Sequence, residues 1–176
     1  MREVLLFIAM SLDGVIATPE GAVDWLGGED AASSDSGSYE RFIAGVSDVV
    51  MGYTTYHQLT TELLPGAWPY AAQSTHVLTH RSMENEAGIS FTQEPVAALL
   101  ARLKAQSGGE IWICGGASVV NQCIRAGLID RYHINVIPTI RGAGIRLFDA
   151  LPEPIPLRLL STEHYNGIVD LVYAPR

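Results

Sequence analysis

The chain has 176 residues, 48% of them hydrophobic, and a formal net charge of −8 at pH 7. This length and composition suit a single domain over residues 1–176, and the acidity, without any cluster of Lys and Arg, argues against a nucleic acid or an anionic membrane as the partner. We therefore expect a small-molecule ligand, and the short apolar start, which lacks a cleavage-site pattern, favours a cytoplasmic protein.

The first part of the chain predicts two buried strands with a helix between them. Residues Val4 to Met10 are nearly all apolar, as in a strand that is covered on both faces, and Val49-Val50-Met51 has the same character. Between them, the stretch from Tyr39 to Val46 carries apolar residues at i, i+3, i+4 and i+7, which is the spacing of an amphipathic helix.

The middle of the chain repeats this alternation. A strand is predicted from Thr75 to Thr79, a helix from Val96 to Leu103 after Pro95, and a further strand from Ile111 to Cys114. Strands of this buried type are usually parallel, because the helices that connect them cover both faces of the sheet. The pattern predicts an α/β fold with helices on both faces of the sheet.

The C-terminal part departs from the alternation. Two strand-like runs, from Leu157 to His164 and from Ile168 to Tyr173, are joined across Asn166-Gly167, a strong signal for a two-residue hairpin turn. The central sheet is therefore predicted to be mixed and mostly parallel, with a C-terminal antiparallel hairpin. The alternating apolar residues of this hairpin suit a contact between two copies of the chain, so we expect a homodimer.

The run from Ile111 to Cys114 stops at Gly115-Gly116, and a helix then begins at Ala117. Two glycines at the start of a helix leave backbone N–H groups bare, with the positive end of the helix dipole behind them. Such a turn can seat a phosphate. The alternative is a simple tight turn between a strand and a helix, since the full dinucleotide-binding spacing is missing.

Three more strand exits carry glycine, threonine or a basic residue, and ligands of open α/β sheets bind outside the carboxyl ends of the strands. With the Gly-Gly turn they make four motifs: Ser11-Leu12-Asp13-Gly14, Gly52-Tyr53-Thr54-Thr55-Tyr56, Thr79-His80-Arg81 and Cys114-Gly115-Gly116. The four together are better evidence for a ligand site than any one of them.

The order and spacing of these motifs, with Leu128-Ile129-Asp130 after the last, resemble the dihydrofolate-reductase-like family. The resemblance is strongest to stand-alone bacterial proteins similar to the C-terminal reductase domain of the bifunctional riboflavin-biosynthesis enzyme, and it spans Val4 to Tyr173. It implies a mixed central sheet with flanking helices and NADPH lying across the strand exits.

The resemblance also implies which residues contact NADPH. Gly52, Thr54 and Thr55 would approach the pyrophosphate, and Thr79, His80 and Arg81 the adenosine end; Gly115, Gly116, Ala117, Ser118 and Val119 would lie on the diphosphate and nicotinamide side, and Ala9, Met10 and Ile16 beside the nicotinamide ring. A guanidinium can hold the 2′-phosphate that distinguishes NADPH from NADH, so Arg81 is the candidate for cofactor choice. The alternative for Arg81 and His80 is that they are ordinary surface residues.

Two features depart from the family pattern. Tyr53 stands where the family usually has a basic residue, which removes one charge expected near the phosphates. The basic residues that bind a substrate phosphate in the riboflavin enzymes are also missing between the first two motifs, where this chain has Asp24-Trp25 and a tract rich in Ser and Asp. A phosphoribosyl pyrimidine is therefore a poor candidate substrate.

Reduction of a C=N or C=O group needs a hydride from the coenzyme, correct orientation and a proton. Asp35, close to the position of the pterin-binding carboxylate of dihydrofolate reductases, and Asp24 are the candidate acids. The alternatives are a helix N-cap for Asp35 and a turn residue for Asp24. Asp13 more simply ties a loop to its own backbone.

Trp25 and Trp68 fall in the two loops expected to face the substrate, where they would stack on a flat ligand or simply pack on the core. No histidine or cysteine spacing points to a metal site. We expect an NADPH-dependent reductase of a small heterocyclic or carbonyl substrate, similar to dihydrofolate reductase or 5-amino-6-(5-phosphoribosylamino)uracil reductase. The alternative is a protein that binds a nicotinamide nucleotide without turnover, as a sensor or interaction module.

Overall fold

The computed structural model describes residues 1–33, 35 and 37–176. The chain forms two compact units, which are described separately. The first unit comprises Met1–Leu5 and Gly45–Ile129, and the second comprises Leu6–Ala44 and Asp130–Arg176. The strand β1 (Val4–Ser11) begins in the first unit and continues into the second. A single domain over residues 1–176 stays a prediction.

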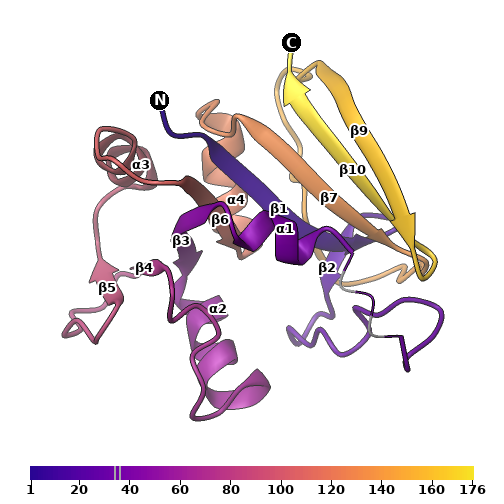
Figure 1. Cartoon of the computed structure of the whole chain (residues 1–176), viewed down its shortest axis with the longest axis horizontal. Coiled ribbons are helices and arrows are strands. Elements are labelled where there is room, and N and C mark those ends of the chain that lie inside the picture. Colours follow the sequence, from indigo (N-terminus) through magenta and orange to yellow (C-terminus); the bar gives the residue numbers. More distant parts are fainter. Residues whose placement is uncertain (34, 36) are drawn as a thin grey trace. The chain divides into compact units, whose positions relative to one another are not determined.

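The first unit is built on parallel strands (Figure 1). Its strands are β3 (Val46–Gly52), β4 (Ser74–Leu78), β5 (Ile89–Thr92) and β6 (Glu110–Gly115), in the order β5-β4-β3-β6-β1. Strand β3 pairs in parallel with both β4 and β6, and β4 pairs in parallel with β5. Val49, Val50 and Met51 are fully buried, which confirms the prediction from their unbroken apolar run.

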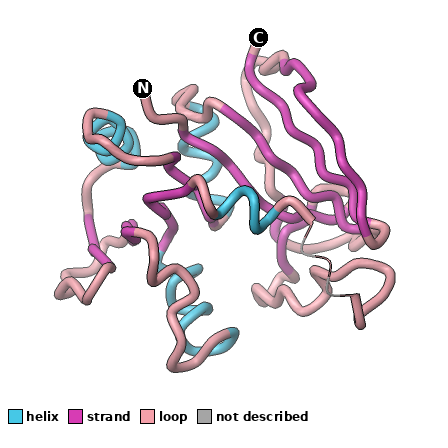
Figure 2. The backbone as a smooth tube through the Cα atoms, viewed as in Figure 1, coloured by secondary structure: helices cyan, strands magenta, loops and turns pink. Residues whose placement is uncertain are grey.

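Helices follow the parallel strands of this unit (Figure 2). They are α2 (Tyr53–Gln58), which runs on into the π-helical turn η1 (Leu59–Leu63), then α3 (Val96–Lys104) and α4 (Ala117–Arg125). Helix α3 buries Val96, Leu99, Leu100 and Leu103, so the predicted apolar spacing does form its inner face.

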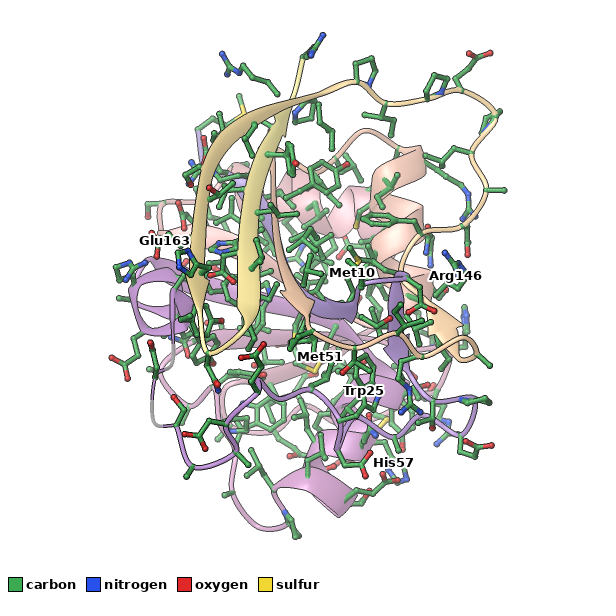
Figure 3. The ribbon with its side chains drawn as sticks, turned by 90° about the vertical axis from the view of Figure 1, so that its right-hand side faces the viewer. Met10, Trp25, Met51, His57, Arg146 and Glu163 are labelled. Carbon is green, nitrogen blue, oxygen red and sulfur yellow. The ribbon has the colours of Figure 1, made fainter. Side chains whose placement is uncertain are left out.

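The second unit carries the antiparallel strands. It contains the later part of β1 with β7 (Arg131–Ile137), β9 (Leu157–Tyr165) and β10 (Ile168–Pro175), in the order β1-β7-β10-β9. Figure 3 labels Met10 near the end of β1 and Glu163 on β9. Strand β1 belongs to both units, and the eight strands form one sheet. This sheet is mixed and mostly parallel, as predicted.

The C-terminal hairpin turns at Asn166 and Gly167, both with positive φ angles, 46° and 76°. Two successive positive φ values define a type I′ turn, whose twist matches that of the flanking strands. Strands β9 and β10 pair in antiparallel register along their length, so the predicted hairpin is confirmed. A second, two-stranded sheet pairs β2 (Val15–Ala17) with β8 (Ile145–Arg146), an association the sequence did not indicate.

The helix α1 (Tyr39–Ile43) packs on β1 within the second unit. The Phe42 ring stacks on the Phe7 ring with centroids 4.2 Å apart, and the His133 ring lies 4.4 Å from the Phe7 ring. The predicted extension of this helix to Val46 is wrong, because Val46 is the first residue of β3 and pairs with Glu110. Although the spacing of Val46 fits a helix, its pairing with β6 places this residue in a strand.

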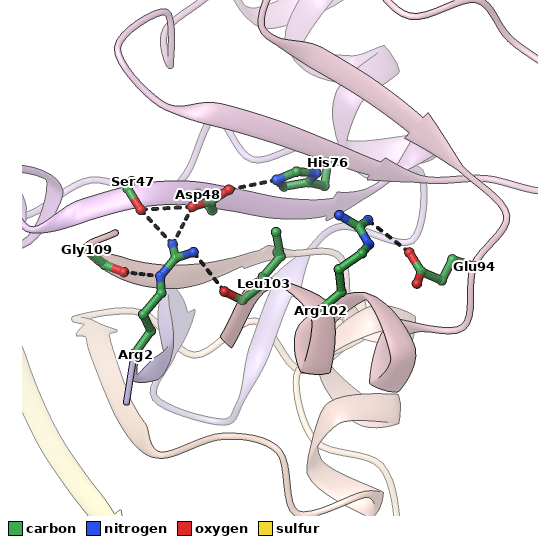
Figure 4. Close-up of polar contacts among 8 residues, drawn as sticks. All are labelled: Arg2, Ser47, Asp48, His76, Glu94, Arg102, Leu103 and Gly109. Carbon is green, nitrogen blue, oxygen red and sulfur yellow. Dashed lines mark hydrogen bonds and ion pairs between the residues drawn. The ribbon is translucent and has the colours of Figure 1, made fainter. Parts of the chain in front are cut away.

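A buried polar network ties the start of the chain to the rest of the first unit (Figure 4). Arg2 is only 9% exposed, and its guanidinium donates hydrogen bonds to Ser47, to Asp48 and to the backbone carbonyls of Leu103 and Gly109. The Arg2 side chain thereby joins β3 to the end of α3 and the start of β6. None of the helices that the structure describes is long and apolar enough to cross a membrane.

Candidate functional site

A cavity of about 500 Å³ lies in the first unit, where its parallel strands end. The lining residues come from the ends of β3, β4 and β5 and from the starts of α2, α3 and α4: Gly52, Tyr53, Thr54, Leu78, Thr79, His80, Arg81, Thr92, Gln93, Glu94, Pro95, Val96, Ser118, Val119 and Gln122. Two of the four sequence motifs, and the helix that follows the fourth, thus meet at one cavity, because the carboxyl ends of parallel strands share one edge of a sheet.

Seven of the predicted coenzyme-binding residues line this cavity. They are Gly52, Thr54, Thr79, His80, Arg81, Ser118 and Val119. The structure does not place Thr55, Gly115, Gly116 or Ala117 in the lining. The neighbours Thr92 to Val96 and Gln122 do line it, although sequence reasoning did not select them, because no motif marks the loop after β5.

The glycines of the second and fourth motifs allow two helix starts to approach each other. A Cβ atom at Gly52 would lie 3.3 Å from the Val119 side chain, and one at Gly116 would lie 3.4 Å from Thr55 Oγ1. A Cβ atom at Gly116 would make an ordinary contact, whereas one at Gly52 would require the Val119 side chain to shift slightly. The peptide bond between Gly115 and Gly116 is cis. Because its hydroxyl lies beside Gly116 and it is not part of the cavity lining, Thr55 borders the fourth motif rather than the cavity.

The start of α4 is suited to an anion. Gly116 is the N-cap and makes no side-chain capping hydrogen bond, and no acidic residue occupies the first turn. The first N–H groups of an α-helix have no partner inside the helix, and the positive end of the dipole lies there. Ser118, in this first turn, adds a hydroxyl group to the lining.

The charge of the cavity comes mainly from Arg81. Among the described residues of the lining, Arg81 and Glu94 are the only ones of the types Lys, Arg, Asp and Glu, and Glu94 pairs with Arg102 at 3.0 Å (Figure 4). Among the described residues, no carboxylate lies within ion-pair distance of Arg81. The cavity therefore presents one uncompensated positive charge.

Tyr53 holds this arginine in place. The guanidinium carbon of Arg81 lies 4.3 Å from the centroid of the Tyr53 ring, and the Tyr53 ring stacks on His57 at 5.8 Å. The backbone N–H of Arg81 also donates to Thr79 Oγ1 at 3.1 Å. The residue that departs from the family pattern thus contributes no charge of its own, but supports the charge of Arg81 through a cation–π contact.

In the second unit, the predicted nicotinamide-side residues lie at the less buried end of β1 and on β2. The first four residues of β1 are buried, whereas Ala9 and Met10 near its end are half-buried, as is Ile16 on β2. Half-buried apolar side chains at the end of a strand can contact a flat ring. The partial exposure of these three residues therefore fits their predicted role, which stays a prediction.

The two candidate acids are both exposed. Asp35 accepts a hydrogen bond from the backbone N–H of Gly37 at 2.8 Å. The alternative of a helix N-cap at Asp35 is wrong, because Ser38 is the N-cap of α1. Asp24 lies in an exposed turn. Neither acid sits in the buried surroundings typical of a tuned general acid, so their catalytic role stays a prediction.

Asp13 ties backbone groups, as predicted, but those of a distant segment. Its carboxylate accepts hydrogen bonds from Ser11 Oγ at 2.6 Å and from the backbone N–H groups of Arg141 and Gly142 at 3.0 and 2.8 Å. The bond from Ser11 and the two backbone bonds hold the pKa of the Asp13 carboxyl well below its usual range.

The two candidate substrate tryptophans have different surroundings. Trp68 belongs to an aromatic cluster of the first unit, with its ring centroid 5.7 Å from that of Tyr56 and 5.5 Å from that of Tyr70. Trp25 is half-buried in the second unit, and the guanidinium carbon of Arg141 lies 5.2 Å from its ring centroid. The surroundings of Trp68 favour the packing alternative.

Sequence reasoning missed a polar cluster in the second unit. Ser38 and Asn135 each donate a hydrogen bond to the buried carboxylate of Asp170, and His133 Nε2 lies 3.0 Å from Ser38 Oγ and 3.3 Å from Asp170 Oδ2. Burial opposes the charge of Asp170, but the hydrogen bonds from His133, Ser38 and Asn135 outweigh it and lower the pKa of this carboxyl. Only the strand register, which pairs Asp170 with Asn135, reveals the cluster.

This cluster is not a serine-nucleophile relay. In such a relay, one ring nitrogen of the histidine faces the serine and the other faces the carboxylate. Here Ser38 and Asp170 both contact Nε2 of His133. Desolvation raises the pKa of nearby Tyr165 to about 12, and the charge of Asp170 adds to this effect. The geometry therefore favours a structural tie between α1, β7 and β10.

Comparison with known proteins decides the family. Residues 2–171 match the model of the RibD C-terminal domain. The chain belongs to this family. An uncharacterized protein of Bacillus subtilis, YwjB, is 38% identical over 174 residues, which is 98% of this chain and 97% of YwjB.

Solved structures similar to this RibD C-terminal domain chain agree with the predicted fold. A Shewanella sp. PV-4 protein proposed to act in riboflavin biosynthesis superposes with a TM-score of 0.86 at 24% identity, covering 99% of each chain. Dihydrofolate reductase from Enterococcus faecalis, solved with NADP(H), superposes with a TM-score of 0.67 at 18% identity, covering 98% of this chain and 96% of that one. The resemblance and the dihydrofolate-reductase-like fold are thus confirmed.

Proposed function

We propose that this RibD C-terminal domain chain is an NADPH-dependent reductase that acts on a small heterocyclic or carbonyl-bearing substrate. One observation carries the proposal: the same cavity is lined by Arg81, which has no carboxylate partner among the described residues, and by the start of α4, which has no side-chain cap. A phosphorylated dinucleotide needs both features, because its diphosphate favours a helix N-terminus and its 2′-phosphate favours a guanidinium.

The residues of the cavity fit such a coenzyme. Arg81, held over Tyr53, would bind the 2′-phosphate, and the N–H groups at the start of α4 would bind the diphosphate. The hydroxyls of Thr54, Thr79 and Ser118 supply neutral hydrogen bonds along the way. When bound, NADPH supplies the hydride, so the chain needs only to orient the two reactants, exclude water and admit a proton.

The remaining assignments rest on the resemblance. Ala9, Met10 and Ile16 would contact the nicotinamide ring, and Asp35 or Asp24, directly or through a water molecule, would deliver the proton. Trp25 and Trp68 remain the candidate contacts for a flat substrate. We also propose that the chain forms a homodimer through the exposed C-terminal hairpin.

The test is a titration of the purified full chain with NADPH and NADH, followed by assays of coenzyme oxidation with a panel of pterins, other heterocycles and carbonyl compounds. Tight NADPH binding with turnover of one panel member supports the reductase. Tight binding with no oxidation across the panel favours the alternative, a nucleotide-binding sensor. If no nicotinamide nucleotide binds, both functions are excluded.

A further inference from the structure

Glu94 brings a carboxylate to the cavity at the strand ends, which Arg81 also lines. The backbone of Glu94 is fixed, because its N–H donates to Thr92 Oγ1 at 3.1 Å and because Pro95, the N-cap of α3, follows it. The cavity holds about 500 Å³. Charges on its walls therefore lie within about one Debye length of any group bound there, about 10 Å at 0.1 M salt. Glu94 and Arg81 thus act on the same ligand.

A carboxylate on the wall of this cavity has an effect opposite to that of Arg81. It repels a phosphate group, because both carry negative charge. A ribose hydroxyl, in contrast, can donate a hydrogen bond to a carboxylate, which is how many dinucleotide sites select NAD over NADP. Without compensation, Glu94 would favour NADH over NADPH.

Arg102 supplies this compensation from outside the cavity. Its guanidinium donates a hydrogen bond to Glu94 Oε2 at 3.0 Å, from a position eight residues further along the chain on α3 (Figure 4). Arg102 is not among the residues of the lining, so it takes no space from the ligand. The two side chains are 49% and 28% exposed, and an ion pair this open to solvent adds little to stability. Its main effect is on the charge of the cavity.

We infer that Arg102 is a specificity-determining residue of the coenzyme site, because it neutralises Glu94 and thereby lets the cavity accept the 2′-phosphate of NADPH. This inference rests on the proposed function and deepens it. Arg81 attracts the 2′-phosphate, and Arg102 removes the repulsion that would oppose it. In the absence of Arg102, the Glu94 carboxylate would repel the 2′-phosphate and accept a hydrogen bond from the 2′-hydroxyl of NADH.

The experiment is a calorimetric titration of the full chain and its variants with NADPH and with NADH, and the readout is the ratio of the two dissociation constants. In Arg102→Gln the preference for NADPH should fall by about two- to tenfold, as expected for one uncompensated charge about 10 Å away between the dielectric limits of a protein surface and water. In Glu94→Gln it should stay the same or rise. Loss of the ion pair alone would move both variants in the same direction.

A double variant and a control make the test specific. Arg102→Gln combined with Glu94→Gln should recover at least the wild-type preference, because the carboxylate that Arg102 neutralises is no longer there. The control is Lys104→Gln, which removes one positive charge from the same helix at a residue outside the lining. It should keep the wild-type ratio. Thermal unfolding of each variant shows that it is folded.

An unchanged ratio in Arg102→Gln would overturn the inference, as would an equal fall in Arg102→Gln and Glu94→Gln, or a double variant that stays as low as Arg102→Gln. Binding by the wild type, measured in the same titrations, separates this result from the fate of the reductase. If NADPH binds and the variants leave the ratio unaltered, the reductase stands and the inference fails. If both nucleotides bind but no panel compound is reduced, the reductase fails, and the ratios still decide the role of Arg102. If neither nucleotide binds, both fail.

Discussion

At the scale of single residues, Arg81 is the side chain on which cofactor choice depends. It lines the cavity, and among the described residues it has no carboxylate partner to compete with a phosphate. Replacing Arg81 with Ala should remove a charge-assisted hydrogen bond to the 2′-phosphate, at a cost of about 1.5–3 kcal/mol. The preference for NADPH over NADH, measured as the ratio of dissociation constants, should fall accordingly.

The control for this change is Arg158→Ala on the exposed strand β9, which should leave the ratio unchanged. A variant at Arg81 with an unaltered preference for NADPH would show that the 2′-phosphate is bound elsewhere.

Tyr53 should affect the coenzyme only through Arg81. The Tyr53→Phe variant keeps the ring under the guanidinium and should bind NADPH as the wild type does. The Tyr53→Ala variant loses a cation–π contact worth about 0.5–1 kcal/mol at an exposed site, so its dissociation constant for NADPH should rise by about two- to fivefold. Calorimetric titration measures both. The double variant with Arg81→Ala should show no further loss, and additive losses would mean that Tyr53 contacts the coenzyme itself.

At the scale of elements, the carboxylate of Asp48 joins β3 to β4 and to the start of the chain. Its Oδ1 lies 2.8 Å from His76 Nε2 on β4, and it also accepts a hydrogen bond from Arg2. Burial opposes the ionised form of Asp48, but the hydrogen bonds from His76, Arg2 and Ser47 more than offset this, and the net effect lowers the pKa of Asp48 below its usual 3.8.

The lowered pKa sets the sign of a pH dependence. Because the folded chain binds the Asp48 proton less readily than the unfolded chain, this group contributes stability above about pH 3.8, and the contribution is lost as the pH falls through the lower folded value. The Asp48→Asn variant, which leaves Arg2 without its ion pair, should lose about 3–5 kcal/mol in the free energy of unfolding at neutral pH.

Urea unfolding of the Asp48→Asn variant and the wild type across this pH range provides the measurement. The stability difference between the two should narrow as the medium becomes more acidic than pH 3.8. A difference that stays constant, or grows, in acid would mean that the pKa of Asp48 is not lowered by folding. Glu153→Gln, at an exposed position outside every helix and strand, is the control and should change little.

For the molecule as a whole, the exposed edge strand β9 is the segment most suited to contact a second chain. All its residues except the two terminal ones are exposed, and it carries Leu159 and Leu160 at 52% and 45% exposure. A long exposed edge strand with apolar residues is a ready template for another chain. The proposed homodimer would cover it.

Sedimentation of the wild type should therefore give a dimer, and Leu159→Arg should shift it to the monomer, because an unpaired charge would be buried at the contact. Leu63→Arg, at a leucine of the first unit with 45% exposure, should remain dimeric. A wild type that sediments as a monomer at all concentrations would exclude the dimer.

Much of the candidate site could be predicted from the residues that follow the buried strands. Gly52, Thr54, Thr79 and Arg81 were selected because each follows a buried strand, and parallel strands bring their carboxyl ends to one edge. Val46 shows where this reasoning stops, since the residue continues a helical spacing and yet enters β3. Its state depends on pairing with Glu110, which is far away in the chain.

The family, the alternation of buried strands and helices, and the C-terminal hairpin could all be predicted from the residues alone, because they depend on local spacing, turn residues and ordered motifs. The contacts between side chains of distant segments became visible only in the folded chain: Tyr53 lies under Arg81, Asp13 binds the segment of Arg141, and Trp25 lies beside that arginine. Such contacts depend on strand register and loop closure, which no local pattern encodes.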